Sequence, residues 1–148
     1  NTEISGSVLN KFNVTSYENL DDLLKVCDAV SICTPTLTHF EIAKKAILQK
    51  CHLFIEKPIT NSVQEAKELI QLSKKHRRLI QVGHIERFNP AFCTYNKKNT
   101  NPRFIESHRL SPFNIRGTDV DVILDLMIHD IDILITHKNI LTETQSVK

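Results

Sequence analysis

Glycine is scarce in this chain, which has only Gly6, Gly83 and Gly117 among its 148 residues. A G-x-G-x-x-G phosphate loop needs closely spaced glycines, so it cannot occur within these residues. Long apolar runs are missing too: none would span a bilayer, and no signal-peptide pattern is present. We therefore expect no membrane partner and, as the default, a cytoplasmic location.

Cysteine spacing and charge exclude further classes of protein. Cys27, Cys33, Cys51 and Cys93 form no C-x-x-C pair, which favours reduced, packed thiols over a disulfide framework or a zinc site. The formal net charge of +2 is too small to indicate a nucleic acid or an anionic membrane as a partner. The one basic run, residues 74–78, ends an amphipathic helix, where cations favour the negative end of the helix dipole.

What the chain does contain is an alternation of short apolar runs and amphipathic segments. The predicted strands cover residues 28–33, 53–55 and 79–82. Between them, Thr38 with Glu41 and Ser62 with Glu65 have the spacing of a capping box, and apolar residues follow each at helical intervals. Upstream, Ser16 is predicted to cap a short helix. Strands that alternate with helices predict an α/β fold with a parallel sheet.

The pattern changes after Gly83, and we place a domain boundary near residue 90. Asn89-Pro90 has the form of a helix start. Residues 103–110 alternate between apolar and polar side chains, which predicts a half-buried antiparallel strand. The last strong element, residues 121–135, is predicted to be a helix that is apolar on most sides.

Two polar segments follow neighbouring predicted strands. Thr34-Pro35-Thr36 and Glu56-Lys57-Pro58 both stand at carboxyl ends of strands, where open α/β sheets bind ligands. Pro58 fixes the backbone after Lys57 and holds the lysine out of the following helix. The lysine either points into a ligand cleft or is a solvated residue in an ordinary loop.

A narrow polar stripe runs along the last predicted helix. Asp125 and His129 are four residues apart and share one face, and Asp121 and Asp132 extend it. Because unpaired buried charge is costly, this stripe should face something polar. It is either a structural hydrogen-bond network or an acid/base site in which Asp125 orients the His129 imidazole. No third ligand with suggestive spacing accompanies this pair, so no metal is expected.

Four motifs follow one another along residues 12–136 in a fixed order. They are Cys33-Thr34-Pro35 with His39, Glu56-Lys57-Pro58, Gly83-His84 with Arg87-Phe88-Asn89-Pro90, and Asp125-x-x-x-His129-x-x-Asp132. In this ordered set the chain resembles a known family, the Gfo/Idh/MocA oxidoreductases. The resemblance implies hydride transfer from a sugar or polyol hydroxyl to NAD or NADP.

The resemblance also implies an architecture and roles for residues. Residues 1–90 would be the later part of a Rossmann-like NAD(P)-binding domain, and residues 91–148 the start of an α/β substrate domain with a mostly antiparallel sheet. Lys57 would be the catalytic-site lysine, Asp125 its acidic companion and His129 the proton acceptor, although which of Lys57 and His129 acts as the base stays open. The residues that would line the nicotinamide end of the cofactor are Thr34, Pro35, His39, Glu56 and Lys57.

A narrower resemblance concerns the substrate. Residues 106–113 and 116–122 look like those of the branch that oxidises UDP-N-acetylglucosamine at the sugar 3-hydroxyl. Arg87, Arg109 and Arg116 would then bind substrate, with Arg109 and Arg116 meeting the diphosphate through their guanidinium groups. The alternative for Arg109 is an ion pair with Glu106 or another nearby acid.

The chain departs from the family at both ends. The family's first strand, glycine-rich loop and first helix are missing, as is the residue that separates NAD from NADP. We therefore expect an internal fragment of a dehydrogenase that binds cofactor poorly by itself and would form a homo-oligomer when complete. The alternatives are a non-catalytic binding or regulatory relative and an inactive truncated remnant.

Overall fold

The computed structural model describes residue 9 and residues 11–98, 102–110 and 121–137. Its sheet has three parallel strands in the order β1-β2-β3, which are β1 Ala29–Ile32, β2 His52–Ile55 and β3 Ile80–Val82. The register places Leu53 between Val30 and Ile80. The predicted strands and their parallel direction are confirmed, so the three carboxyl ends meet at one edge of the sheet.

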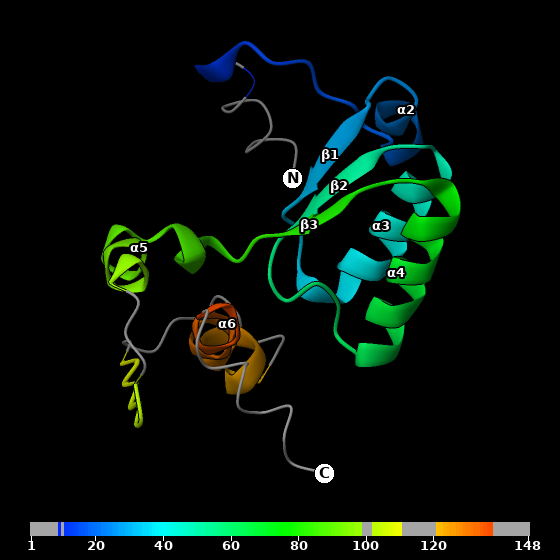
Figure 1. Cartoon of the computed structure of the whole chain (residues 1–148). Helices are drawn as coiled ribbons and strands as arrows, with labels where there is room; N and C mark the ends of the chain where they lie inside the picture. The colour runs from blue at the N-terminus through cyan, green and yellow to red at the C-terminus, as the bar shows by residue number, and fades with distance from the viewer. Residues whose placement is uncertain (1–8, 10, 99–101, 111–120, 138–148) are drawn as a thin grey trace.

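Two helices connect these strands and cover one face of the sheet (Figure 1). Helix α3, His39–Leu48, leads from β1 to β2, and helix α4, Val63–His76, leads from β2 to β3. Alternate strand residues and the apolar faces of the helices form a single buried core. Its members are Leu24, Ile32, Ala43, Ala46, Ile47, Cys51, Leu53, Ile55 and Leu69. Burial of this apolar surface is the main force that holds the sheet and its helices together.

The helix caps agree with the sequence in part. At the start of α4, the Ser62 hydroxyl accepts from Glu65 N–H and the Glu65 carboxylate accepts from Ser62 N–H, so this capping box is confirmed. The box predicted at Thr38 is wrong. A 3₁₀ turn, Thr36–Thr38, runs directly into α3, and the Thr38 hydroxyl donates to the Pro35 carbonyl instead. The short upstream helix α2, Leu20–Leu24, is capped by Asn19 and not by Ser16.

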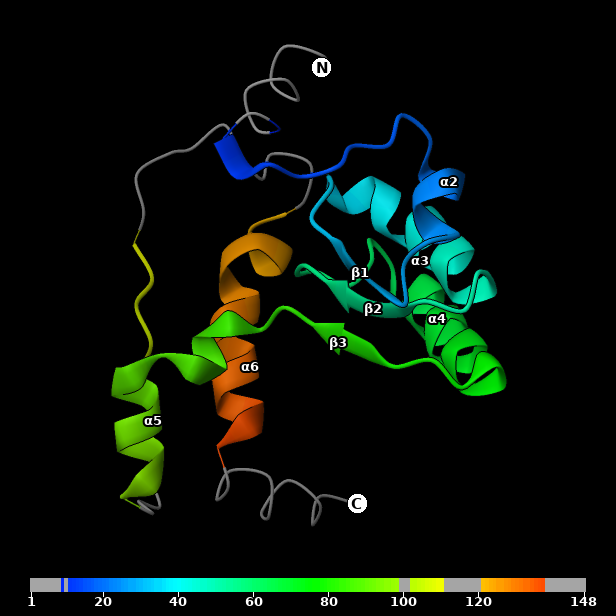
Figure 2. The same ribbon diagram turned by 90° about the horizontal axis from the view of Figure 1, so that it is seen from above.

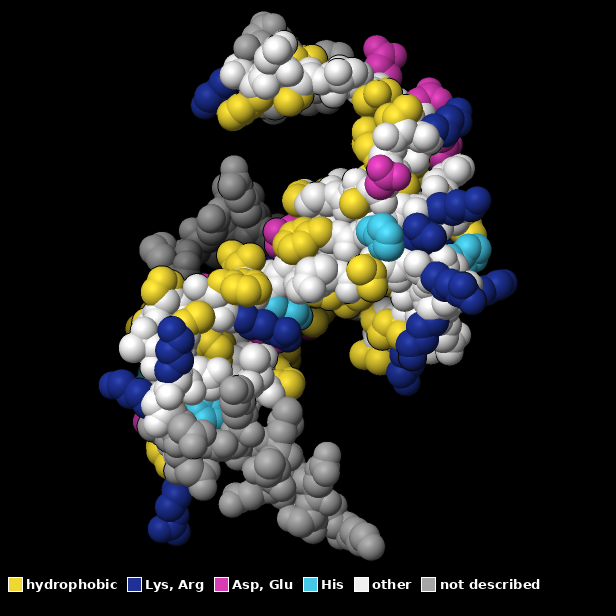
Figure 3. All heavy atoms as spheres, turned by 45° about the horizontal axis from the view of Figure 1, so that its top comes forward, with side chains coloured by type: hydrophobic (Ala, Val, Ile, Leu, Met, Phe, Trp, Pro, Cys, Tyr) yellow, Lys and Arg dark blue, Asp and Glu magenta, His cyan; other side chains and the backbone are white. Residues whose placement is uncertain are grey.

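The basic run at the end of α4 lies on the outside of the molecule. Lys74 and Lys75 are exposed in the last turn of the helix, and Figure 3 shows lysine and arginine side chains along the outer side of the α3 and α4 layer. Arg77 ends the helix in the left-handed conformation, with φ of 53°.

Beyond the carboxyl edge of the sheet lies a second group of helices (Figure 2). A 3₁₀ turn, Ile85–Phe88, follows β3 and leads into α5, Pro90–Lys97, where Asn89 accepts from Ala91 N–H as predicted for a helix start. The last predicted helix consists of a π-helical segment, Ile123–Met127, and α6, Ile128–Thr136. No helix among the described residues is both long and apolar enough to cross a membrane.

The predicted strand over residues 103–110 is wrong. These residues form no regular structure and are exposed, with Phe104 at 80% and Leu110 at 93% of full exposure. A strand needs a hydrogen-bonded neighbour, and the described residues supply none at this position. The mostly antiparallel sheet expected of a second domain is accordingly not supported, because the strands of the described residues are all parallel.

Candidate functional site

Lys57 and Asp125 meet where the sheet edge faces the last helical segment. Lys57 stands two residues after the end of β2, and its Nζ donates to Asp125 Oδ1 at 2.9 Å and to the Asp125 main-chain carbonyl at 2.6 Å. The side chains are 20% and 34% exposed, respectively. The structure thus joins two residues 68 positions apart in sequence and leaves the third ammonium hydrogen available for another acceptor.

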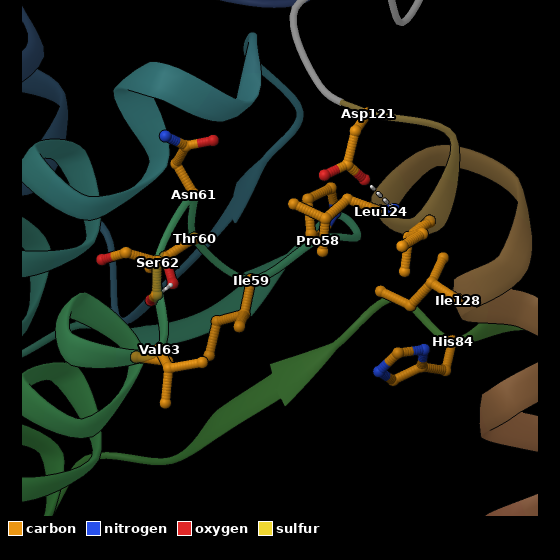
Figure 4. Close-up of a pocket in the computed structure, with 12 residues that line it drawn as sticks. Pro58, Ile59, Thr60, Asn61, Ser62, Val63, His84, Asp121, Leu124 and Ile128 are labelled. Atoms are coloured by element: carbon orange, nitrogen blue, oxygen red, sulfur yellow. Dashed lines mark hydrogen bonds between the residues drawn. The ribbon is translucent and has the colours of Figure 1, made fainter.

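The π-helical segment places Asp125. Ile128 N–H donates to the Ile123 carbonyl five residues back, as a π turn requires, and the Asp121 carboxylate accepts from Leu124 N–H at 2.9 Å (Figure 4). Such single π turns within helices are frequent at functional sites. Here the segment presents both a main-chain and a side-chain oxygen of Asp125 to Lys57.

His129 lies one turn further along the same helical segment. Burial is the main cause that lowers the pKa of its imidazole below 6.5, and the positive charges of Lys57 and Arg109 add to the effect. Its Nδ1 is buried and finds no hydrogen-bond partner among the described residues. A lowered pKa keeps the ring neutral near pH 7, which is the form that accepts a proton.

His39 joins the two polar segments that follow β1 and β2. The ring is 1% exposed, with Nδ1 2.9 Å from the Pro58 carbonyl and Nε2 2.9 Å from the Thr34 carbonyl. Each ring nitrogen thus lies within hydrogen-bonding distance of a main-chain carbonyl. His39 was predicted to line the cofactor, but its ring is engaged beneath these segments, so any influence on a ligand passes through the backbone that it fixes.

Glu56 and the Thr34-Pro35 turn remain at the carboxyl edge of the sheet. The hydroxyl oxygens of Thr34 and Thr38 lie 2.8 Å apart. A Cβ at Gly83 would lie 3.1 Å from Glu56 Oε2, so the glycine makes room for the Glu56 side chain over the end of β3. These groups lie on neighbouring strand ends beside Lys57, as the sequence predicted.

The three arginines predicted to bind substrate differ in their surroundings. Arg87 forms a two-point hydrogen-bonded ion pair with Asp132, and Arg109 forms one with Asp130, with Nη2 to Oδ1 at 3.1 Å. Arg109 therefore forms an ion pair, which was the alternative to diphosphate binding, and its partner is Asp130 rather than Glu106. Arg116 lies outside the described residues.

The carboxylates of these two pairs are ionised. Burial opposes ionisation of Asp132, but the hydrogen bonds from Arg87 and the charges of His84 and Arg87 outweigh it and lower the pKa. The pKa of Asp130 is lowered chiefly by its hydrogen bonds from Arg109. Asp130 had no predicted role, because its position next to His129 puts it off the polar stripe.

A pocket of about 370 Å³ lies between the start of α4 and the π-helical segment (Figure 4). Ile59, Val63, Leu124 and Ile128 supply much of its apolar wall, while His84 supplies a polar edge. Lys57, Asp125 and His129 do not line it, although their chain neighbours Pro58, Leu124 and Ile128 do. Among the described residues, no cluster of three or more His, Cys, Asp or Glu side chains could hold a metal ion.

The chain is similar to known oxidoreductases. A family model for an oxidoreductase family with an NAD-binding Rossmann fold matches residues 1–84. The chain is 40% identical over 134 residues to the UDP-N-acetylglucosamine 3-dehydrogenase of Acidithiobacillus ferrooxidans, which is 90% of this chain and 43% of that protein. It is also 36% identical over 90 residues to the scyllo-inositol 2-dehydrogenase (NAD(+)) of Bacillus subtilis, covering 61% of this chain and 26% of that one.

A solved structure extends the similarity to the fold. The UDP-N-acetylglucosamine 3-dehydrogenase of Acidithiobacillus ferrooxidans superposes with a TM-score of 0.82 at 41% identity, over 89% of this chain and 44% of that one. A dehydrogenase from Clostridium difficile superposes with a TM-score of 0.76 at 24% identity, over 91% of this chain and 45% of that one, a likeness of fold alone. The chain thus spans less than half the length of these relatives.

Proposed function

The chain belongs to the Gfo/Idh/MocA oxidoreductase family, whose NAD-binding Rossmann fold matches more than half of it, and on this premise we propose that it carries the proton-transfer residues of a nicotinamide-dependent sugar dehydrogenase. The observation that carries the proposal is the contact of Lys57 with two oxygens of Asp125, with His129 one turn away. The substrate proposed is a nucleotide sugar of the UDP-N-acetylglucosamine type, oxidised at the 3-hydroxyl, which is supported by the 40% identity to an enzyme of that name.

The residues present fit the nicotinamide end of a dinucleotide. Thr34, Pro35, Glu56 and Lys57 gather at the carboxyl ends of two parallel strands, where such cofactors bind in open α/β sheets. The glycine-rich loop that would hold the pyrophosphate does not occur in these 148 residues. When bound, the nicotinamide would supply an acceptor for the hydride that leaves the carbinol carbon.

Lys57 and His129 have different roles in this proposal. The Lys57 ammonium uses two of its three hydrogens on Asp125, so its third can donate to the reacting hydroxyl oxygen and hold it in place. The neutral His129 ring can accept the hydroxyl proton as the C–H bond breaks and the carbonyl forms. The assignment of His129 as base and Lys57 as donor is supported by the hydrogen bonds of Lys57 to Asp125 and by the lowered pKa of His129.

The test is oxidation of UDP-N-acetylglucosamine by the natively produced protein that contains these residues, followed through formation of reduced nicotinamide with NAD⁺ or NADP⁺. We expect Lys57→Met and His129→Asn to lower kcat by about 10²–10⁴-fold, the usual contribution of a positioned acid or base. Lys75→Met, an exposed lysine on α4, is the matched control and should leave kcat unchanged. Unchanged turnover in Lys57→Met and His129→Asn would contradict these roles, and a lack of turnover in the unsubstituted protein would favour the non-catalytic relative.

Two further features stay proposals. We place a domain boundary near residue 90, supported by the end of the sheet at Val82 and by the family match to residue 84. Assembly of the protein into a homo-oligomer is the second proposal, and the mass of the protein in solution tests it.

A further inference from the structure

We propose that Arg87 is a positioning residue, which holds Asp132 and thereby fixes the rotation of α6 that brings His129 and Asp125 to Lys57. The inference rests on the proposed function, and it assigns Arg87 a role other than the substrate binding predicted from the sequence. The structural basis is a pair of clamps, Lys57 on Asp125 and Arg87 on Asp132, with His129 between them.

The contact between Arg87 and Asp132 is directional. Arg87 Nε donates to Asp132 Oδ2 at 2.7 Å, while Nη2 donates to Oδ1. Asp132 is 6% exposed. Two parallel hydrogen bonds between a planar guanidinium and a carboxylate restrict the rotation of both groups, which a single bond to a lysine would not do.

The two clamps start from adjacent strands of one rigid sheet. Lys57 follows β2 and Arg87 follows β3, and these strands pair along the whole of β3. Their partners, Asp125 and Asp132, are seven residues apart on the helical segment. His129 precedes Asp132 by three residues, so both lie on one side of α6 and must turn together.

The apolar side chains of this helical segment are at most partly buried. Asp132 is the one buried residue of α6, and the π-helical segment has none. Apolar contacts have no preferred direction, so the rotation of the helix that places His129 is set by polar contacts, whose geometry is specific. Because Asp132 stays ionised, the pair with Arg87 persists over the pH range in which His129 titrates.

The test compares a double variant, Arg87→Met with Asp132→Leu, against a matched control, Lys44→Met with Glu68→Leu. The control removes an exposed ion pair of 2.8 Å between α3 and α4, two helices that carry no residue of either clamp. The apolar double variant leaves no buried charge unpaired, which favours retention of the fold. The readouts are the NMR titration of the His129 ring, and kcat and KM for the proposed substrate.

We expect the double variant to move the titration midpoint of His129 upward, toward 6.5, because the ring loses its buried setting beside Lys57, Arg109, Glu86 and Asp130. We also expect kcat to fall by about 10²-fold with KM little changed, as a misplacement of about 1 Å can produce. The control should alter neither quantity.

Three results would overturn the proposal: an unchanged His129 titration in the folded double variant, a raised KM with unchanged kcat, or the same shifts in the control. If the double variant does not fold, Arg87→Lys provides the test, because lysine keeps the positive charge but cannot make the two parallel hydrogen bonds of the guanidinium. An unchanged His129 titration in Arg87→Lys would also overturn the proposal. The titration needs no turnover, so it tests the clamp even if the protein proves not to be a dehydrogenase.

Discussion

Lys57 is held by two oxygens of Asp125, of which only one belongs to the side chain. This arrangement can be tested with a double-mutant cycle made of Lys57→Met, Asp125→Ala and the double variant. Lys57→Met removes both hydrogen bonds. Asp125→Ala removes the carboxylate but leaves the main-chain carbonyl, so the two single variants should not be equivalent.

The expected magnitudes follow from the exposure of the pair. A hydrogen bond with a charged partner contributes about 1.5–3 kcal/mol, and partial exposure moves the value toward the lower end. We expect Asp125→Ala to lower the free energy of unfolding by about 1–2 kcal/mol and Lys57→Met by about 2–3 kcal/mol. In the Asp125→Ala background, Lys57→Met should still cost about 1 kcal/mol, because the bond to the carbonyl remains to be lost.

Urea denaturation of the four proteins measures these values. Lys25→Met is the matched control, because Lys25 forms an exposed ion pair with Asp22 at 2.8 Å, and surface pairs contribute about 0.2–1 kcal/mol. The reasoning is refuted if Lys57→Met costs nothing once Asp125 is alanine. In that case the carbonyl contact does not form, and the carboxylate alone holds the lysine.

Three other predictions concern residues around this pair. Burial and the charge of Lys57 lower the pKa of His129, so the NMR titration of the ring should have a midpoint below 6.5. The contribution of the neutral ring to stability should be lost as the pH falls from 6.5 through that midpoint. A midpoint above 6.5 would contradict this prediction. Gly83→Ala would place a Cβ 3.1 Å from Glu56 Oε2 and should lower the free energy of unfolding by about 1–3 kcal/mol, as overpacking does. An unchanged midpoint of urea denaturation would mean that the Glu56 side chain moves aside. Ser62→Ala removes a capping-box acceptor and should cost about 1 kcal/mol of unfolding free energy, with no loss expected if another group caps α4.

The parts of the fold that the sequence predicted are those set by local pattern. The strand β2 and the helix α4 follow from an apolar run, a capping box at Ser62 and apolar spacing, and these signals agree with one another. At Thr38 the same capping signal failed. The 3₁₀ turn before α3 gave its hydroxyl another acceptor, and side chains of this type readily bond to local backbone groups.

The strand predicted over residues 103–110 failed for a non-local reason. Alternation of apolar and polar residues shows which side chains could share a face, but a strand exists only where another strand pairs with it. The described residues provide no such partner, and Phe104 and Leu110 are exposed. No property of the segment itself could have shown this.

The site was predicted as residue types but not as contacts. Spacing placed Asp125 and His129 on one face, and the resemblance linked them to Lys57, but neither indicated a π turn or a main-chain acceptor at Asp125. The partner of Arg87 was also beyond sequence reasoning. A guanidinium at a strand end suits a phosphate as well as a carboxylate, and the choice depends on which element packs opposite.

The position of the helix that carries Asp125 and His129 is set by chemistry different from that of the sheet. The core beneath β2 is apolar, and apolar contacts have no preferred direction, so substitutions there should change stability with little change in the orientation of Lys57 or His129. The helix instead meets the sheet edge through Lys57 and Arg87, whose hydrogen bonds are directional and partly open to solvent. Loss of either contact should therefore disturb the alignment of His129 before it unfolds the domain. A screen for stability alone would miss such variants, whereas a screen for the His129 titration would find them.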